Sequence, residues 1–171
     1  CGMGRTGEMF AWQHYGIKPD IMTSAKALGC GVPVGAFAMT ERVAEKSLAP
    51  GDHGTTYGSN PFVGAAVSKV MDLFEELKLT DHVKEIAVYL ESELDKLVEE
   101  YDFITARRGM GLMQGLVSTK PVGTIAAEAL KEGLIIITAG ADVIRMVPPL
   151  VIEKEHVDEM ITKLKNVLDR M

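Results

Sequence analysis

Two consecutive stretches of helical periodicity, near residues 60–100, constrain the fold of this chain more than any other feature. Asn60-Pro61 opens the first stretch, because Asn is a preferred N-cap and Pro suits the first helical turn. Thr80-Asp81 is expected to cap the second stretch. Apolar residues recur at helical spacing in both, at Val63, Val67, Val70, Met71, Phe74 and Leu77, and then at Val83, Ile86, Ala87, Leu90, Leu94, Leu97 and Val98. Each stretch therefore predicts an amphipathic helix.

The patterns on the two sides of these helices differ. The N-terminal side is rich in loops, with short strands expected over 21–24 and 34–39 and a brief helix over 40–47. On the C-terminal side strand and helix patterns alternate, with strands expected over 104–108, 111–118, 134–138 and 143–147 and helices over 122–132 and 154–170. We therefore expect a loop-rich piece over residues 1–77 and a compact α+β domain over residues 78–171.

Composition excludes several classes of function. The chain has 171 residues, of which 47% are hydrophobic and 25% charged, as in a soluble globular protein. A net charge of −6 argues against nucleic-acid binding, and no apolar run approaches the roughly 20 residues of a membrane span. Cys1 and Cys30 are the only cysteines, which favours a reducing cytoplasm, and the four histidines lack the spacing of metal ligands. Because the chain opens at Cys1 inside a glycine-rich loop, we expect it to be the C-terminal portion of a longer protein.

Lys26 lies in an unusual setting for a lysine. It follows the apolar pair Ile21-Met22, has alanines on both sides, and precedes Gly29 and Gly31. Small neighbours let a ligand approach the backbone closely. Desolvation favours the neutral form of a lysine, which can attack a carbonyl and form a Schiff base. Lys26 is therefore either a solvated loop lysine or the attachment point of an aldehyde cofactor such as pyridoxal phosphate.

Two segments are candidates for binding a phosphate. Residues 2–7 match the dinucleotide fingerprint G-x-G-x-x-G, but that motif needs a preceding strand and a helix that opens from its last glycine, so we expect the match to be accidental. The segment from Thr55 to Pro61 offers two threonine hydroxyls ahead of a helix N-terminus, where partial positive charge favours an anion. It is either a capped turn or a phosphate site.

Arg145 interrupts an apolar run just before Pro148-Pro149. A guanidinium in such surroundings needs a compensating anion. A structural carboxylate could supply that anion, or the carboxylate of a substrate could bind through two parallel hydrogen bonds.

Together these segments resemble the class III pyridoxal-phosphate-dependent aminotransferases, closest to the branch that acts on N-acetylornithine. The resemblance rests on Lys26 in its small-residue loop, on Thr56 before Tyr-Gly-Ser-Asn-Pro, and on Arg145 in Ile-Arg-Met-Val-Pro-Pro-Leu. Further matches run through the whole chain in order, at Gly4-Arg5-Thr6-Gly7, Phe10-Ala11, His14-Tyr15-Gly16-Ile17-Lys18-Pro19-Asp20-Ile21, Ala139-Gly140 and Pro148-Pro149-Leu150. The resemblance implies the C-terminal part of a fold-type I transferase, with the remnant of a large α/β cofactor-binding domain over residues 1–77 followed by a small α+β domain over residues 78–171.

The resemblance also implies a role for each candidate residue. Lys26 would hold pyridoxal 5'-phosphate covalently and shuttle the proton, Thr56 would bind the cofactor phosphate of the neighbouring subunit in a homodimer, and Arg145 would bind the substrate α-carboxylate. The implied reaction moves an amino group from N-acetylornithine to 2-oxoglutarate in arginine biosynthesis. In the family, the aspartate on the pyridine nitrogen, the phosphate loop and the ring-stacking aromatic lie upstream of the position of Cys1, so we expect this chain alone to have little activity.

Three alternatives remain open at this point. The amino donor could be ornithine, succinylornithine, 4-aminobutyrate or an aminomutase substrate. The chain by itself could be a catalytically inert α+β oligomerisation module. A nicotinamide-dependent dehydrogenase ranks last, because it rests on the glycine fingerprint alone.

Overall fold

The computed structural model describes all 171 residues, and they form two compact units. Unit 1 contains residues 1–4 and 8–79, and unit 2 contains residues 5–7 and 80–171. The chain therefore leaves unit 1 twice, once for the three residues Arg5–Gly7 and once at Leu79.

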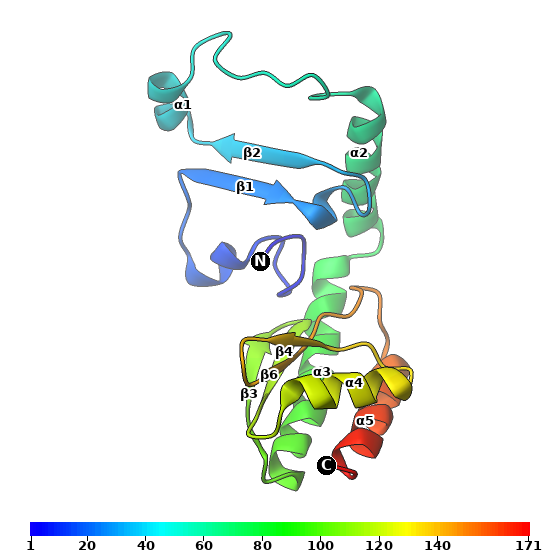
Figure 1. Cartoon of the computed structure of the whole chain (residues 1–171). Helices are drawn as coiled ribbons and strands as arrows, with labels where there is room; N and C mark the ends of the chain where they lie inside the picture. Colours follow the sequence, from blue (N-terminus) through cyan, green and yellow to red (C-terminus); the bar gives the residue numbers. More distant parts are fainter. The chain divides into compact units, whose positions relative to one another are not determined.

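Unit 1 is built around a two-stranded antiparallel sheet (Figure 1). Strands β1 and β2 pair from Ile21 opposite Met39 to Ala25 opposite Gly35. The elements of unit 1 are the 3-10 helix η1 (Ala11–Tyr15), β1 (Ile21–Ala25), the 3-10 helix η2 (Lys26–Leu28), β2 (Gly35–Met39), α1 (Glu41–Ser47) and α2 (Pro61–Glu76). The two strands and the helices that begin at residues 41 and 61 agree with the sequence-based prediction, whereas η2 was not anticipated.

Helix α2 begins where capping chemistry places it. The Asn60 side chain accepts a hydrogen bond of 3.0 Å from the Val63 amide nitrogen, and Pro61 occupies the first turn. No residue of α2 is fully buried, and its apolar stripe is only half-buried. Large apolar side chains of unit 1 remain exposed, among them Tyr15, Tyr57 and Phe62. Unit 1 therefore has a thin core in this chain and much unpartnered apolar surface.

Unit 2 is a four-stranded antiparallel sheet packed against three helices (Figure 1). The strand order is β3-β4-β6-β5, so the last two strands have crossed in the sheet relative to their order in the chain. The elements are α3 (Leu79–Glu100), β3 (Ile104–Met110), β4 (Met113–Ser118), α4 (Val122–Lys131), β5 (Ile137–Ala139), β6 (Val143–Met146) and α5 (Lys154–Leu168). This is the α+β arrangement that the sequence predicted.

A single apolar core holds unit 2 together. The inward stripes of α3, α4 and α5 meet the inward residues of the sheet, including Leu116 and Ile144, which are fully buried. Such burial stabilises each large side chain by about 1.5–3 kcal/mol. A polar contact links the ends of two of these helices, because the hydroxyl of Tyr101, just after α3, donates to Asp169, just after α5, at 2.5 Å.

Two boundaries differ from the prediction. Helix α3 begins at Leu79 rather than after a Thr80-Asp81 cap. The left-handed Lys78 (φ 46°) separates α2 from α3, and the next residue, Leu79, is already buried in the core. Strand β5 is shorter than the predicted 134–138, because the Leu134 amide donates to the Ala129 carbonyl at 2.8 Å and thereby closes the end of α4. Gly133, in the left-handed conformation, ends α4 as expected.

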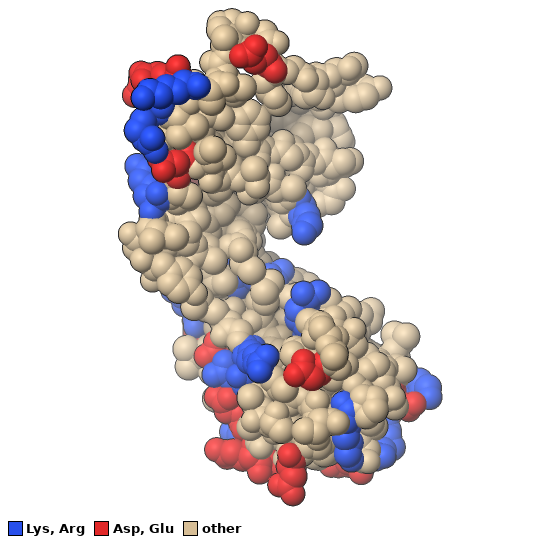
Figure 2. Space-filling model, turned by 60° about the vertical axis from the view of Figure 1, so that its left-hand side comes forward, with Lys and Arg blue, Asp and Glu red and all other residues tan.

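The surface of unit 2 mixes acidic and basic side chains, whereas much of unit 1 is uncharged (Figure 2). No helix of the chain is both long enough and apolar enough to cross a lipid bilayer.

Candidate active site

Lys26 lies at the first residue after β1, in a backbone conformation that lysine rarely adopts. Its φ is 53°, in the left-handed region, and the short helix η2 begins at the same residue. A second left-handed residue, Cys30 (φ 47°), follows within the same turn. Each such non-glycine residue costs about 1–3 kcal/mol, and strain of this kind gathers at functional sites. The strain at Lys26 therefore marks this turn as a candidate site.

Gly29 makes the turn possible because there is no room for a side chain at its position. A Cβ on Gly29 would lie 2.3 Å from the Val32 carbonyl oxygen and 2.6 Å from Cγ1 of Val34. The Gly29 amide donates to the Lys26 carbonyl oxygen at 3.1 Å, and the Val32 amide donates back to the Gly29 carbonyl oxygen at 3.1 Å. Among the small residues that the sequence places after Lys26, Gly29 is thus required by close packing.

The amine of Lys26 is not engaged by the chain. Lys26 is exposed, and none of the side-chain hydrogen bonds or ion pairs of the chain involves it. Of the two alternatives that the sequence left open, the chain as folded here has a solvated lysine, because the alanines on both sides do not cover the amine.

Thr56 lies in the exposed segment that leads into α2. A turn precedes the helix, with the Gly58 amide donating to the Thr55 carbonyl at 3.1 Å, and Asn60 uses its side chain to cap α2. The Thr56 hydroxyl takes no part in these bonds. Beside this segment is a cavity of about 740 Å³, lined by Thr23, Ser24, Gly35, Ala36, Phe37, His53, Gly54, Thr55, Gly58 and Ser59. The cavity contains polar groups from β1 and from the neighbours of Thr56, but neither Lys26 nor Thr56 itself.

Arg145 belongs to unit 2, in the middle of β6. It pairs with Gly115 of β4 on one side and with Ile137 of β5 on the other, so its backbone is fixed by the sheet. Its Nε is buried and has no hydrogen-bond partner. It lines a cavity of about 390 Å³ whose other walls are almost entirely apolar, including Ile137, Val147 and Pro149.

An unsatisfied buried donor requires an explanation, because leaving it unpaired costs about 1–3 kcal/mol. The sequence left open whether a structural carboxylate or a ligand would pair with Arg145. The ion pairs of unit 2 join acidic residues to Arg107, Lys96, Lys131, Lys163, Lys165 and Arg170, and none of them involves Arg145. The arrangement thus favours a carboxylate ligand, which the guanidinium can hold with two parallel bonds.

Arg5 is a residue whose structural role was missed by the analysis of the sequence. Its Nη1 donates to the carbonyl oxygen of Leu112 at 3.3 Å and to that of Pro148. Burial lowers the pKa of Arg5 from its ordinary value. Its motif, Gly4-Arg5-Thr6-Gly7, was used only as a sign of resemblance, and nothing in the local pattern indicated a contact more than 100 residues away.

The glycine fingerprint at residues 2–7 does not have the context of a dinucleotide site. No helix opens from Gly7, and the next element is the 3-10 helix η1. Gly2 instead forms an isolated bridge with Phe10. The chain has no group of three or more His, Cys, Asp or Glu residues placed to hold a metal ion, and both cysteines are free and exposed.

The class of protein follows from comparison with known families. The family described as Aminotransferase class-III matches the chain over residues 1–168, and the chain belongs to that family. It is similar to the acetylornithine aminotransferases of Methanocaldococcus jannaschii, with 46% identity over 98% of this chain, and of Gloeobacter violaceus, with 43% identity over 99%. In both cases the chain spans 42% of the length of the relative.

Solved structures show the same fold. An acetylornithine aminotransferase from Elizabethkingia anophelis superposes with a TM-score of 0.90 and 27% identity, over 99% of this chain and 44% of its own. The ornithine delta-aminotransferase of Plasmodium falciparum gives a TM-score of 0.88 and 29% identity, over 99% of this chain and 46% of its own. The fold is therefore that of the C-terminal part of these enzymes.

Proposed function

We propose that the protein containing this chain is a pyridoxal-phosphate-dependent aminotransferase that moves the amino group of N-acetylornithine to 2-oxoglutarate, in arginine biosynthesis in the cytoplasm. The observation that carries the proposal is the unengaged amine of Lys26 in a strained left-handed turn, within a chain of this family. The printed names of the relatives support the choice of amino donor.

Lys26 and Thr56 carry the chemical groups that binding of pyridoxal phosphate requires. A covalent attachment needs an amine that no carboxylate holds, and Lys26 provides one. A phosphate needs hydroxyl and amide donors, and Thr56 lies in an exposed segment that leads into the N-terminus of α2. When bound, the cofactor supplies an electron sink that stabilises the carbanion formed at the substrate α-carbon.

Lys26 performs the proton transfers in this proposal. Its Nζ would hold the cofactor covalently through the aldehyde carbon, with release of water, and would be freed when the substrate amine takes its place. Once free, Nζ, tethered at the end of β1, would be the base placed to take the proton from the substrate α-carbon and the acid that gives it back. The rigid turn between Lys26 and Gly29 limits where that nitrogen can move, which lowers the entropic cost of both steps.

Arg145 orients the substrate. Its guanidinium binds the α-carboxylate through parallel hydrogen bonds, and the apolar walls of its cavity exclude water from that pair and strengthen it. Because β6 is paired on both sides, the carboxylate position is fixed by the sheet and not by a loop.

Thr56 is proposed to serve the neighbouring subunit of a homodimer. An exposed hydroxyl with no partner in its own chain is suited to bind a group from another chain. The exposed apolar side chains of Tyr57 and Phe62, on either side of the α2 cap, would be covered in such a dimer.

The test is a panel of amino donors with the full-length protein. Single-turnover rates are measured by the change in cofactor absorbance after mixing with N-acetylornithine, ornithine, succinylornithine or 4-aminobutyrate. The proposal requires N-acetylornithine to react fastest, by about tenfold or more in kcat/KM. A faster reaction with ornithine would move the protein to a different branch of the family, and no reaction with any donor would contradict the transaminase assignment.

A further inference from the structure

The segment Val147–Pro149, which follows β6, forms one wall of the cavity beside Arg145. Two of its three residues are prolines, which have no N–H and so cannot be anchored through a backbone donor. The backbone of the two prolines can therefore be held by hydrogen bonds only through its carbonyl oxygens. Pro149 uses its carbonyl in a local turn, where it accepts from the Ile152 amide at 3.4 Å.

The carbonyl oxygen of Pro148 is held from a distant part of the chain. It accepts a hydrogen bond from Nη1 of Arg5, and the same nitrogen also donates to the carbonyl oxygen of Leu112 at 3.3 Å. Leu112 lies in the turn between β3 and β4, and its amide donates back to the Arg5 carbonyl oxygen at 2.9 Å. Arg5 thus joins the β3–β4 turn to the proline segment.

The β3–β4 turn is shaped to receive this segment. A Cβ on Gly111 would lie 2.5 Å from the Arg5 carbonyl oxygen and 2.6 Å from Cα of Thr6, and Gly111 itself has a left-handed φ of 61°. Residues 5–7 consequently belong to unit 2, although their neighbours on both sides belong to unit 1. An arginine that donates to two carbonyl oxygens, with no carboxylate partner, orders backbone rather than neutralising charge.

We propose that Arg5 is a positioning residue: by holding the Pro148 carbonyl it fixes the Val147–Pro149 wall of the carboxylate cavity and keeps the ligand against Arg145. The inference rests on the proposed function for the identity of the ligand, a carboxylate substrate. It adds a residue that acts through the wall and does not touch the substrate.

The test compares Arg5→Met with Arg42→Met in the full-length protein. Arg42 is a matched control, because it is an exposed arginine whose ion pair with Asp20 lies in unit 1. Two readouts do not depend on transaminase activity: the hydrogen exchange of the peptide covering residues 147–152, and the affinity for glutarate, used as a dicarboxylate probe and measured by calorimetry.

Arg5→Met is expected to speed exchange in this peptide and to weaken glutarate binding about tenfold, the scale of one hydrogen bond from a charged donor. Arg42→Met should change neither. If the full-length enzyme is a transaminase, Arg5→Met should raise KM for 2-oxoglutarate by a similar factor with less than about a threefold change in kcat.

Arg5→Lys keeps the charge and a donor nitrogen on a shorter side chain, so it should restore part of the affinity. It also provides a second variant if Arg5→Met does not fold. Unchanged exchange in residues 147–152 would overturn the inference, and so would faster exchange with unchanged glutarate affinity. A protein without any transaminase activity contradicts the proposed function alone, since both readouts still apply.

Discussion

Lys26 and Gly29 close the turn after β1 with a hydrogen bond of 3.1 Å from the Gly29 amide to the Lys26 carbonyl oxygen. Gly29 can do this only without a side chain, because its Cβ would meet the Val32 carbonyl oxygen at 2.3 Å. Gly29→Ala should therefore lower the stability of unit 1 by about 1–3 kcal/mol, the usual cost of overpacking. The fluorescence of Trp12, the only tryptophan, can follow this unfolding. Gly54→Ala is the control, because its Cβ would meet no atom within 4 Å; equal effects of the two changes would refute the close-packing argument.

The strain at Lys26 gives a second prediction. At a φ of 53°, glycine has no steric penalty, whereas alanine retains it. Lys26→Gly should be more stable than Lys26→Ala by about 1 kcal/mol, although both remove the amine. Urea unfolding followed by Trp12 fluorescence measures the difference. Equal stability of the two variants would mean that the backbone at this residue is not strained.

Arg145 should lower the stability of the fold while it supports binding. Arg145→Met removes a buried Nε that has no partner, so the free energy of unfolding of unit 2 should stay the same or rise by about 1 kcal/mol. Glutarate affinity should fall by roughly 30- to 100-fold, because a charge-assisted pair of bonds is lost. Arg108→Met is the control, as Arg108 lies opposite Gly115 on the other side of β4 and is exposed. A marked loss of stability in Arg145→Met would indicate a structural role instead.

The contact between Tyr89 and Asp158 predicts a pH dependence. The Tyr89 hydroxyl donates to Asp158 at 2.5 Å, and this bond is the main cause that raises the pKa of Tyr89 from 10.0 to about 12. Because the folded pKa is raised, the stabilisation is complete below pH 10 and is lost as the pH rises toward 12. Tyr89→Phe should therefore melt at a lower temperature than the wild type at pH 8, and the gap should narrow as the pH rises from 10 toward 12. A gap that persists at high pH would contradict the assignment.

Local patterns predicted most of the fold. The strands at β1, β4 and β6 and the helices α1, α2 and α5 lie close to their predicted ranges, because periodicity and the Asn60 cap are determined within a few residues. The start of α3 was predicted too late, after Thr80-Asp81 instead of at Leu79, since the break depends on a left-handed Lys78 that composition does not reveal. The length of β5 depended on how Leu134 closes α4.

The candidate site was only partly accessible from sequence. Lys26 and Arg145 were indicated by the mismatch between a charged side chain and small or apolar neighbours, and the structure adds strain at the first and an unpaired Nε at the second. The sequence left open whether Lys26 is solvated, because neighbouring small residues indicate close packing without stating what packs there. Arg5 was missed as a contact, since its partners Leu112 and Pro148 are distant in the chain.

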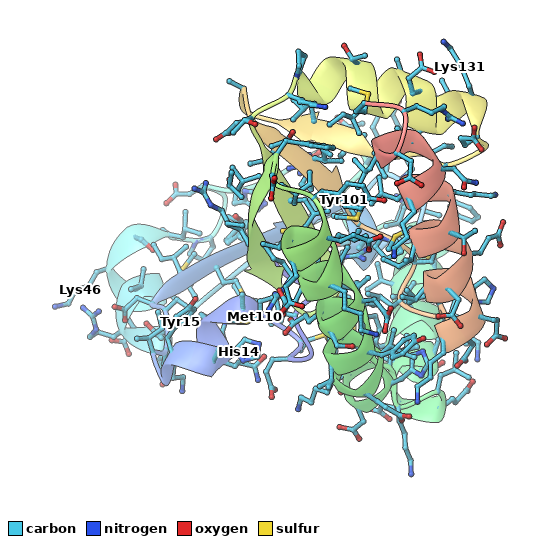
Figure 3. The ribbon with its side chains drawn as sticks, turned by 90° about the horizontal axis from the view of Figure 1, so that it is seen from below. His14, Tyr15, Lys46, Tyr101, Met110 and Lys131 are labelled. Carbon is cyan, nitrogen blue, oxygen red and sulfur yellow. The ribbon has the colours of Figure 1, made fainter.

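The most direct test of the account asks where the cofactor is attached. The full-length protein is loaded with pyridoxal phosphate, treated with borohydride to make the link to the amine permanent, digested, and mapped by mass spectrometry. Lys46, which points outward from α1 (Figure 3), provides the matched control variant Lys46→Ala beside Lys26→Ala. The account predicts the added phosphopyridoxyl mass on the peptide that contains Lys26, retained in Lys46→Ala and absent in Lys26→Ala. The same mass on a different lysine of the wild type, or its retention in Lys26→Ala, would contradict it.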